Sequence, residues 1–184
     1  VATEHTGDPE ISSALEHLAE NGHHNLAAFS YDGGETRFGG LGADEHTEFE
    51  IGSITKTFNA ELVRQFIEEG ELSLDTQVQE LIDVPSAPIS DVTLEELLNH
   101  TSGLATTESL SFKELFMANL RDGGNPYRRD TPQDIIDAAG AAQLKDRGEK
   151  QYSNYGHALL GQLLATHAGV PYDELLRTRI FEPA

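Results

Sequence analysis

The sequence predicts an α+β protein, because strand patterns occur early in the chain and helical patterns fill most of the remainder. A β-hairpin pattern lies between residues 26 and 41, and apolar residues follow helical spacing from residue 53 onward. With 184 residues, 38% of them hydrophobic, the chain is long enough to bury a core. We therefore expect an antiparallel sheet with flanking helices, followed by a helical lobe.

The first fifty residues predict a helix, a hairpin and one more short strand. Apolar residues recur at helical spacing over 11–19, with Pro9 before them and an Asn-Gly pair after them. The Asp32-Gly33-Gly34 turn separates two strand-like runs within residues 26–41. Residues 48–51 alternate polar and apolar, which predicts a further short strand.

A series of helices is predicted after Ser53, with their ends marked by glycine and proline. Apolar residues spaced by four begin at Ile54 and stop at Gly70, and Thr93 with Glu96 forms a capping box. Pro85 and Pro88 mark a loop between these two helices, and a turn is expected over 123–126. The expected helices cover residues 53–69, 112–120, 132–142, 155–167 and 171–180, and one more begins at Thr93 and ends between His100 and Gly103.

A sheet of only three strands would be incomplete, because it would have an unpaired edge and an uncovered face. We therefore expect that a second polypeptide, a C-terminal segment after Ala184 or a second copy of the chain completes the sheet. We divide the chain, as one incomplete domain over 1–184, into the first helix and strands over 1–52 and the helical lobe over 53–184.

The chain is strongly acidic, with 32 acidic and 12 basic residues and a formal charge of −20. Such a surface repels nucleic acids and anionic membrane surfaces, so neither is an expected partner. An acidic excess is typical of salt-adapted, halophilic proteins, since hydrated carboxylates keep them soluble in concentrated salt. An acidic surface that serves ordinary solubility fits the composition equally well, and the sequence leaves both interpretations open.

The sequence contains no cysteine, which excludes disulfides and thiolate chemistry and leaves the redox compartment undetermined. No apolar run approaches the roughly 18 residues that a membrane span needs. The chain starts at Val1 without an initiator methionine, so we expect a mature product whose targeting segment has been removed. Secretion or a periplasmic location fits this expectation, and a cytoplasmic location is also open.

Ser53 and Lys56 form a Ser-x-x-Lys pair where a strand pattern gives way to a helix. Three residues are almost one helical turn, so the hydroxyl and the amine project from the same face. The positive end of the helix opposes a second positive charge, which favours a neutral Lys56 that accepts the serine proton. A capping serine beside a solvated lysine would show the same spacing, and spacing alone favours that alternative.

Tyr152-Ser153-Asn154 opens a second apolar helix and is the other candidate for chemistry. A phenol aimed into a cleft can relay a proton, and an amide two residues later can bind a substrate carbonyl. A turn in which Asn154 caps the following helix is the structural alternative.

Four segments together resemble a known group of serine hydrolases. Residues 49–58 (Phe-Glu-Ile-Gly-Ser-Ile-Thr-Lys-Thr-Phe) look like the nucleophile segment of the class C β-lactamases, DD-carboxypeptidases and family VIII esterases. Residues 97–104 (Leu-Leu-Asn-His-Thr-Ser-Gly-Leu) are similar to a characteristic helix end of that group. Residues 148–161 resemble its Tyr-x-Asn segment, and residues 180–183 resemble the usual continuation.

The resemblance implies a β-lactamase/transpeptidase-like fold and acyl transfer without a metal or cofactor. Ser53 would attack the carbonyl of a β-lactam, a D-amino-acid or peptidoglycan-like peptide, or an ester; Lys56 and Tyr152 would shuttle the proton, and Asn154 would bind substrate. The Ser53 N–H would be one oxyanion donor.

The group's third motif, Lys-Thr-Gly or His-x-Gly on a later strand, does not occur before Ala184. Loss of one oxyanion donor costs about 10²–10³ in rate, so we expect little or no activity from this chain alone. A catalytically silent fragment or binding module of the same fold is the alternative.

A cluster near the N-terminus, His17, Glu20, His23 and His24, has a spacing that could bind a surface metal ion. A solvated loop is the commoner reason for two adjacent histidines after Asn-Gly, so we assign no metal residues. We interpret His100 as structural, and nothing marks His157 or His167 for a function.

Overall fold

The computed structural model describes residues 3–84, 86–106 and 131–183. The chain forms two compact units, Val1–Ile51 and Gly52–Ala184. The helix and the turn expected over 112–120 and 123–126 lie outside the described residues.

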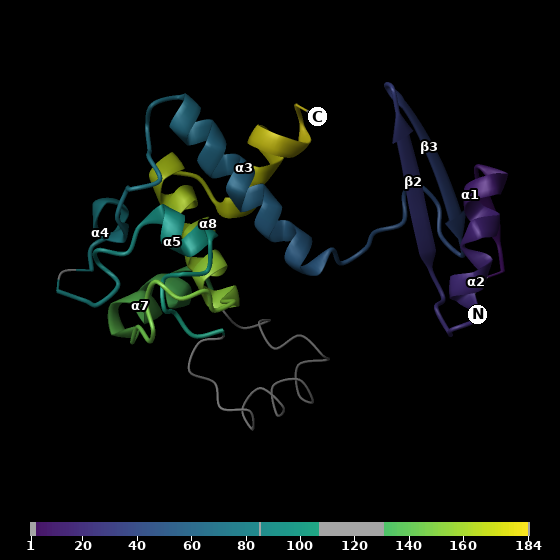
Figure 1. Cartoon of the computed structure of the whole chain (residues 1–184). Helices are drawn as coiled ribbons and strands as arrows, with labels where there is room; N and C mark the ends of the chain where they lie inside the picture. Colours follow the sequence, from purple (N-terminus) through teal and green to yellow (C-terminus); the bar gives the residue numbers. More distant parts are fainter. Residues whose placement is uncertain (1–2, 85, 107–130, 184) are drawn as a thin grey trace. The chain divides into compact units, whose positions relative to one another are not determined.

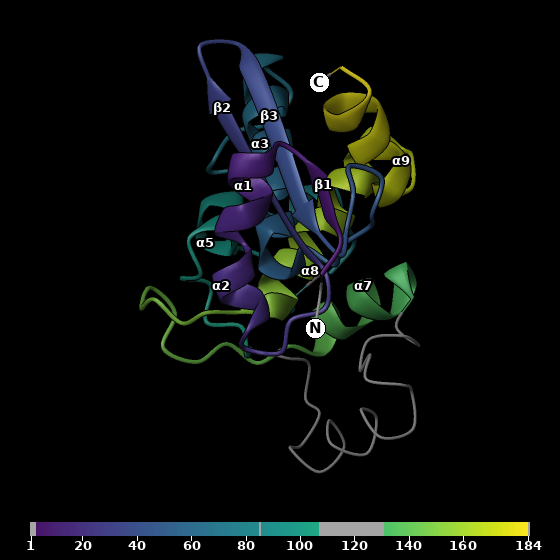
Figure 2. The same ribbon diagram turned by 90° about the vertical axis from the view of Figure 1, so that its right-hand side faces the viewer.

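The first unit, whose hairpin is labelled in Figure 1, contains a three-stranded antiparallel sheet in the order β1-β3-β2, which Figure 2 labels in full. Strands β2 (Leu26–Asp32) and β3 (Glu35–Leu41) form the predicted hairpin, which is confirmed. Gly33 and Gly34 connect the strands with φ angles of 58° and 98°. Two consecutive positive φ angles are what a tight hairpin turn of the right twist requires, and glycine adopts them without steric cost.

The third strand is not the one that the sequence predicted. Residues 48–51 form no strand, whereas β1 (His5–Gly7) pairs with β3 and places His5 opposite Leu41. The polar and apolar alternation over 48–51 is a strand pattern, but no described strand pairs with it. Strand β1 is only three residues long, too short to give a recognisable period.

Two short helices, α1 (Pro9–Ala14) and α2 (Glu16–Ala19), replace the single helix expected over 11–19. The Asp8 carboxylate begins α1 by accepting the N–H groups of residues 10 and 11. Both helices lie against one face of the hairpin, as Figure 2 shows, and Leu15, between them, and Ala19 on α2 pack with Leu41 there. On β2, Phe29 and Tyr31 remain 74% and 68% exposed.

The described residues of the second unit are mainly helical, with α3 (Thr55–Glu68), α4 (Val78–Leu81), α5 (Leu94–Leu98), α7 (Pro132–Ala141), α8 (Asn154–Ala168) and α9 (Tyr172–Leu176). A 3₁₀ turn, Gly52–Ile54, precedes α3, and a π-helical segment, Arg177–Phe181, follows α9. The helices expected at 53–69, 132–142 and 155–167 are confirmed within two residues at each end. The helix expected from Thr93 is confirmed but ends at Leu98, before the expected end at 100–103. The helix expected over 171–180 is shorter and changes to π geometry at Arg177.

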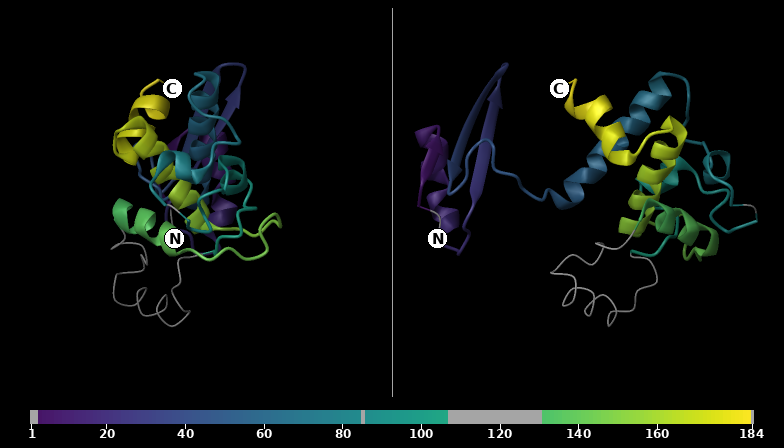
Figure 3. Two further views of the ribbon diagram at one scale, coloured as in Figure 1. Left: turned by 90° about the vertical axis from the view of Figure 1, so that its left-hand side faces the viewer. Right: turned by 180° about the vertical axis from the view of Figure 1, so that it is seen from behind.

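Helix α8 is the centre of this unit. Leu159, Leu160, Leu163 and Leu164 on α8 are fully buried, and helices α3, α4, α5, α7 and α9 all contact it. A helix that is apolar on all sides must be enclosed in this way. Figure 3 shows the unit from behind, with α3 and the C-terminal helices crossing beside one another. The packing fixes α3 and the start of α8 next to each other.

Capping boxes begin α5 and α7, two of the helices that flank α8. The Thr93 hydroxyl accepts the Glu96 N–H while the Glu96 carboxylate accepts the Thr93 N–H, and Thr131 and Asp134 do the same for α7. The capping box predicted at Thr93 is therefore confirmed. Over the described ranges, no helix combines the length and apolar character needed to cross a bilayer.

Candidate active site

Ser53 lies at the point where extended chain turns into α3. Gly52 precedes it with a φ of 53°, in the left-handed region where glycine is favoured, and nothing occupies the space a Cβ would take. Ser53 follows within the 3₁₀ turn and is exposed. A first-turn residue of a helix has no intrahelical acceptor for its N–H, so the Ser53 N–H is suited to bind an anion.

Lys56 lies one turn further along, and its amine lies close to the other three site residues. Its Nζ donates to the Asn154 Oδ1 at 2.7 Å and to the Ser53 Oγ at 3.3 Å. It also lies 4.8 Å from the centroid of the Tyr152 ring. The Lys56 side chain is half-buried, and its amine therefore connects the start of α3 with the start of α8.

Tyr152 and Asn154 are the sequence neighbours of a buried residue, Ser153. The Ser153 hydroxyl accepts the Gly156 N–H at 2.8 Å, so Ser153 is the N-cap of α8. The structural alternative considered from the sequence, in which Asn154 caps this helix, is therefore wrong. Ser153 has extended dihedral angles, and in extended backbone residues two apart project to the same side. The cap thus orients Tyr152 and Asn154 together.

The shortest contact of Ser53 within the site is with Tyr152, since the Ser53 Oγ and the Tyr152 hydroxyl lie 2.7 Å apart. Hydrogen bonding by the Lys56 amine, and then by Ser53, lowers the pKa of the Tyr152 phenol. A donor and a positive charge favour the phenolate over the phenol. The geometry therefore allows a proton to pass from serine to tyrosine beside a cation.

All four site residues named from the sequence come together in the structure. Ser53, Lys56, Tyr152 and Asn154 form one connected hydrogen-bond chain. Asn154 uses its oxygen for Lys56, and within the described ranges its Nδ2 makes no hydrogen bond. That amide group can therefore donate to a carbonyl. The arrangement suits attack by a hydroxyl on an acyl group, with the proton received by the ionised phenolate oxygen of Tyr152.

A second layer of polar residues, which the sequence analysis had not assigned to the site, lies behind these four. His100 stacks on Tyr152 with ring centroids 4.6 Å apart, and His157 lies 4.8 Å from His100. Asn59, one turn beyond Lys56, donates to the His157 carbonyl and accepts the Tyr172 hydroxyl. Burial lowers the pKa of His157 to about 4 and raises that of Tyr172 to about 12.

The signal that could have found this layer is spacing. Asn59 is three residues after Lys56, and His157 is three residues after Asn154, so each lies one helical turn deeper than a site residue. Polar residues at such positions on otherwise apolar helices must pair with each other, because unpaired buried polar groups are costly.

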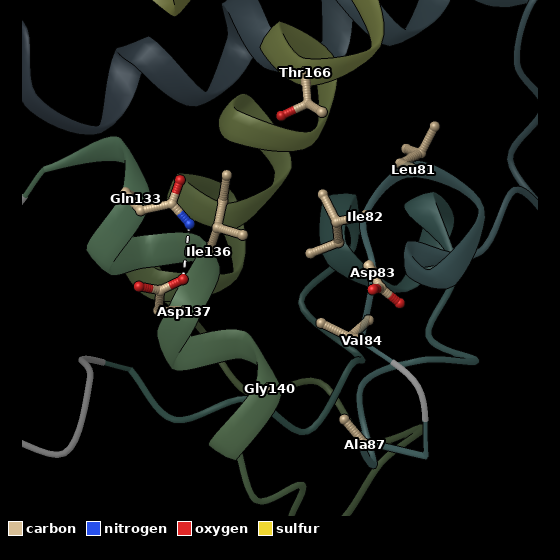
Figure 4. Close-up of a pocket in the computed structure, with 10 residues that line it drawn as sticks. All are labelled: Leu81, Ile82, Asp83, Val84, Ala87, Gln133, Ile136, Asp137, Gly140 and Thr166. Atoms are coloured by element: carbon tan, nitrogen blue, oxygen red, sulfur yellow. Dashed lines mark hydrogen bonds between the residues drawn. The ribbon is translucent and has the colours of Figure 1, made fainter.

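A groove of about 640 Å³ lies elsewhere in the same unit, between α7 and the loop after α4 (Figure 4). Its walls are mainly apolar, and Gln133 donates to Asp137 on one side at 2.7 Å. None of the four site residues lines it. Over the described ranges, no group of three or more His, Asp or Glu side chains is arranged to hold a metal ion.

The chain matches the family model described as Beta-lactamase over residues 11–184. It is 30% identical over 152 residues to penicillin-binding protein 4 of Amycolatopsis lactamdurans, a match that covers 78% of this chain. Two solved structures are similar as well. A D-stereospecific amidohydrolase from Streptomyces superposes on 94% of this chain with a TM-score of 0.73 and 29% identity. The octameric penicillin-binding protein homologue from Pyrococcus abyssi superposes on 94% of this chain with a TM-score of 0.74 and 29% identity.

The chain spans only part of each of these proteins. It covers 36% of the Amycolatopsis protein, 53% of the Streptomyces structure and 42% of the Pyrococcus structure.

Proposed function

Because this chain belongs to the beta-lactamase family, we propose that Ser53 is the nucleophile of a serine hydrolase that acts on amides or esters. The family resemblance and the β-lactamase/transpeptidase fold expected from the sequence motifs are both confirmed. Family and structural relatives support a function of the serine hydrolase type. The roles of individual residues and the substrate are our proposals.

The observation that carries the proposal is the chain of contacts from Tyr152 through Ser53 and Lys56 to Asn154. Serine is a weak nucleophile at its ordinary pKa and needs a neighbouring group to take its proton. The Tyr152 oxygen is within hydrogen-bond distance, and its pKa is lowered by Lys56 and Ser53. We assign Tyr152 as the direct proton acceptor.

In the proposed reaction, the Ser53 Oγ attacks the carbonyl carbon while its proton moves to the Tyr152 phenolate. The Ser53 N–H stabilises the resulting oxyanion. The leaving amine or alcohol departs with the proton from Tyr152, which leaves an acyl group on Ser53. Water then attacks this ester and gives a proton to Tyr152, and Ser53 regains its proton when the acid is released.

Lys56 has an electrostatic role in this scheme. The sequence pattern favoured a neutral Lys56 that takes the serine proton. The Lys56 amine lies 3.3 Å from the Ser53 Oγ, farther than the Tyr152 hydroxyl at 2.7 Å. A donor in this position stabilises negative charge on the tyrosine oxygen and orients the Asn154 amide toward a substrate carbonyl. We therefore propose that Lys56 supports Tyr152 rather than replacing it.

The substrates that we propose are β-lactams, D-amino-acid peptides of the peptidoglycan type, or esters. Each has an acyl carbon that a serine hydroxyl can attack, and the four site residues serve all three alike. We propose further that rates are low when the site has Ser53 N–H as its one oxyanion donor, since a second donor contributes about 10²–10³.

Covalent labelling tests the assignment of Ser53. Purified protein is incubated with a fluorescent penicillin and, separately, with a fluorophosphonate, and the modified peptide is identified by mass spectrometry. We expect the adduct on Ser53, none in Ser53→Ala, and unchanged labelling in Ser73→Ala, which removes an exposed serine near the end of α3. A folded protein that neither probe modifies would instead support the silent binding module.

A further inference from the structure

His100 occupies a backbone position that normally belongs to glycine. It follows the last residue of the α5 C-terminus with a φ of 62°, in the left-handed region. The Thr101 N–H reaches back to the Glu96 carbonyl at 2.9 Å, and the His100 N–H points to Leu97 at 3.5 Å. These two contacts define a Schellman motif with His100 at its left-handed residue, where glycine is usual and a side chain is strained.

The imidazole of His100 has contacts that a glycine could not make. Its Nδ1 accepts the Ser153 N–H at 3.1 Å, and its ring contacts the rings of both Tyr152 and His157. The His100 carbonyl also accepts the Gln151 N–H at 2.8 Å. One residue therefore holds the chain on both sides of Tyr152. Strain that is retained at a residue with such contacts suggests a function for the side chain.

The hydrogen bond fixes the protonation state of the ring. A backbone N–H can only donate, so Nδ1 must be an unprotonated acceptor and the ring proton must reside on Nε2. A second proton would convert Nδ1 into a donor that faces another donor, and the contact with Ser153 would be lost.

We propose that His100 is a positioning residue for Tyr152, whose neutral imidazole holds the phenol against Ser53 and whose protonation releases it. The purpose of this positioning rests on the proposed function, whereas the positioning itself does not. His100 touches none of the reacting atoms and acts through Tyr152 and Ser153.

The charged and titratable groups around His100 favour the neutral ring. Lys56 on α3 and Lys150 before α8 are positive, and the rings of His157 on α8 and of Tyr152 both contact the imidazole. Partial burial, followed by Lys56 and Lys150, lowers the pKa of His100. The ring therefore stays neutral near pH 7 and becomes protonated only in mild acid.

Nuclear magnetic resonance of the folded protein tests the positioning without any catalytic step. With uniform ¹⁵N labelling and ¹³C-labelled tyrosine, we expect the Nε2–H tautomer at His100. In an acid titration, the Ser153 amide and the Tyr152 ring signals should shift with the same midpoint as His100, below pH 6.5. An Nδ1–H tautomer, or Ser153 and Tyr152 signals that stay fixed while His100 titrates, would overturn the proposal.

Three variants separate positioning from backbone strain. His100→Gly relieves the strain but removes the ring, so the Tyr152 signal should move and acylation of Ser53 by the fluorophosphonate should slow about 10- to 100-fold. His100→Asn tolerates the left-handed backbone and offers an oxygen to the Ser153 N–H, so the rate should largely recover and the acid dependence should disappear. Ser86→Gly, at a residue with the same φ of 62° in the loop between α4 and α5, should change neither.

The two proposals fail differently. If Ser53 is never acylated, the function is wrong while the tautomer and the coupled shifts still decide the role of His100. If His100→Gly leaves the Tyr152 and Ser153 signals and the acylation rate as in the parent protein, His100 has no positioning role.

Discussion

The hydroxyl oxygens of Ser53 and Tyr152 lie 2.7 Å apart, closer than the 3.3 Å between the same serine oxygen and the Lys56 amine. This difference makes the tyrosine the better placed proton acceptor. Replacement of Tyr152 by phenylalanine should reduce the rate of Ser53 acylation by about 10²–10⁴, because the acceptor is removed while the ring remains. Stopped-flow or gel-based labelling with the fluorophosphonate measures that rate. Tyr31→Phe, at an exposed tyrosine of β2, serves as the control, and equal rates in Tyr152→Phe and the parent would contradict the assignment.

Lys56 should control the ionisation of Tyr152. Because the amine lowers the pKa of the phenol, Lys56→Met should raise it toward its ordinary value. Absorbance near 295 nm follows phenolate formation, and an early transition from Tyr152 is expected in the parent protein and not in the variant. The exposed Lys145→Met provides the matched charge change. An early transition that persists in Lys56→Met would show that another group is responsible.

Ser153 should contribute to stability through its buried hydroxyl. That hydroxyl caps α8 and also donates to the Ala105 carbonyl at 2.6 Å, so Ser153→Ala removes a cap and leaves a carbonyl without its partner. The expected loss in the free energy of unfolding is about 1–3 kcal/mol, measured by urea denaturation. Ser13→Ala, at an exposed residue of α1, should change it little, and similar values for the two variants would count against this packing.

Buried His157 should make the protein less stable in mild acid. Its pKa is lowered from 6.5 to about 4, so the unfolded state takes up a proton first as the pH falls. The stability from the neutral ring is complete above pH 6.5 and disappears progressively toward pH 4, with a total of at most about 3 kcal/mol. Urea denaturation at pH 7 and pH 5 measures the loss. The loss should be smaller in His157→Asn, and equal losses would mean that other groups dominate.

The charge of −20 should make the melting temperature depend on salt. Repulsion among carboxylates destabilises the compact state at low ionic strength. Salt screens this repulsion, because the Debye length falls from about 30 Å at 0.01 M salt to about 3 Å at 1 M. The melting temperature should therefore rise with NaCl at pH 7. Near the isoelectric point the slope should disappear, since the net repulsion is then gone. A flat curve at pH 7 would favour the acidic surface as a device for solubility alone.

Local patterns predicted the parts of the structure that local physics determines. The turn at Gly33 and Gly34 and the capping box of Thr93 with Glu96 each specify their element within a few residues, and both occur as predicted. The strand expected at 48–51 failed because alternation alone does not supply a pairing partner. Strand β1 was missed because its existence depends on β3, which lies more than thirty residues later.

In the site, too, contacts within one helix could be predicted from the sequence, whereas contacts between segments far apart in the sequence could not be predicted from local patterns. The Ser53 and Lys56 pair follows from helical spacing, but its meeting with Tyr152 and Asn154 depends on the packing of α3 against α8. Only the family resemblance of the two segments predicted that meeting. The position of His100 beside Tyr152 could not be predicted, because its left-handed backbone and its contact with Ser153 arise only when the two segments fold together.

The distance along the chain between Lys56 and Asn154 has a consequence for synthesis. These hydrogen-bonded partners are 98 residues apart, so α3 leaves the ribosome long before the helix that completes its surroundings. At about 5–20 residues per second, that interval is on the order of 5–20 s. During it, the first unit can fold, because its sheet and helices are close in sequence. Helix α3 meanwhile exposes apolar residues such as Leu62 and Phe66, which are fully buried in the finished protein. The nascent chain is therefore expected to need a holding chaperone most between the emergence of α3 and that of α8.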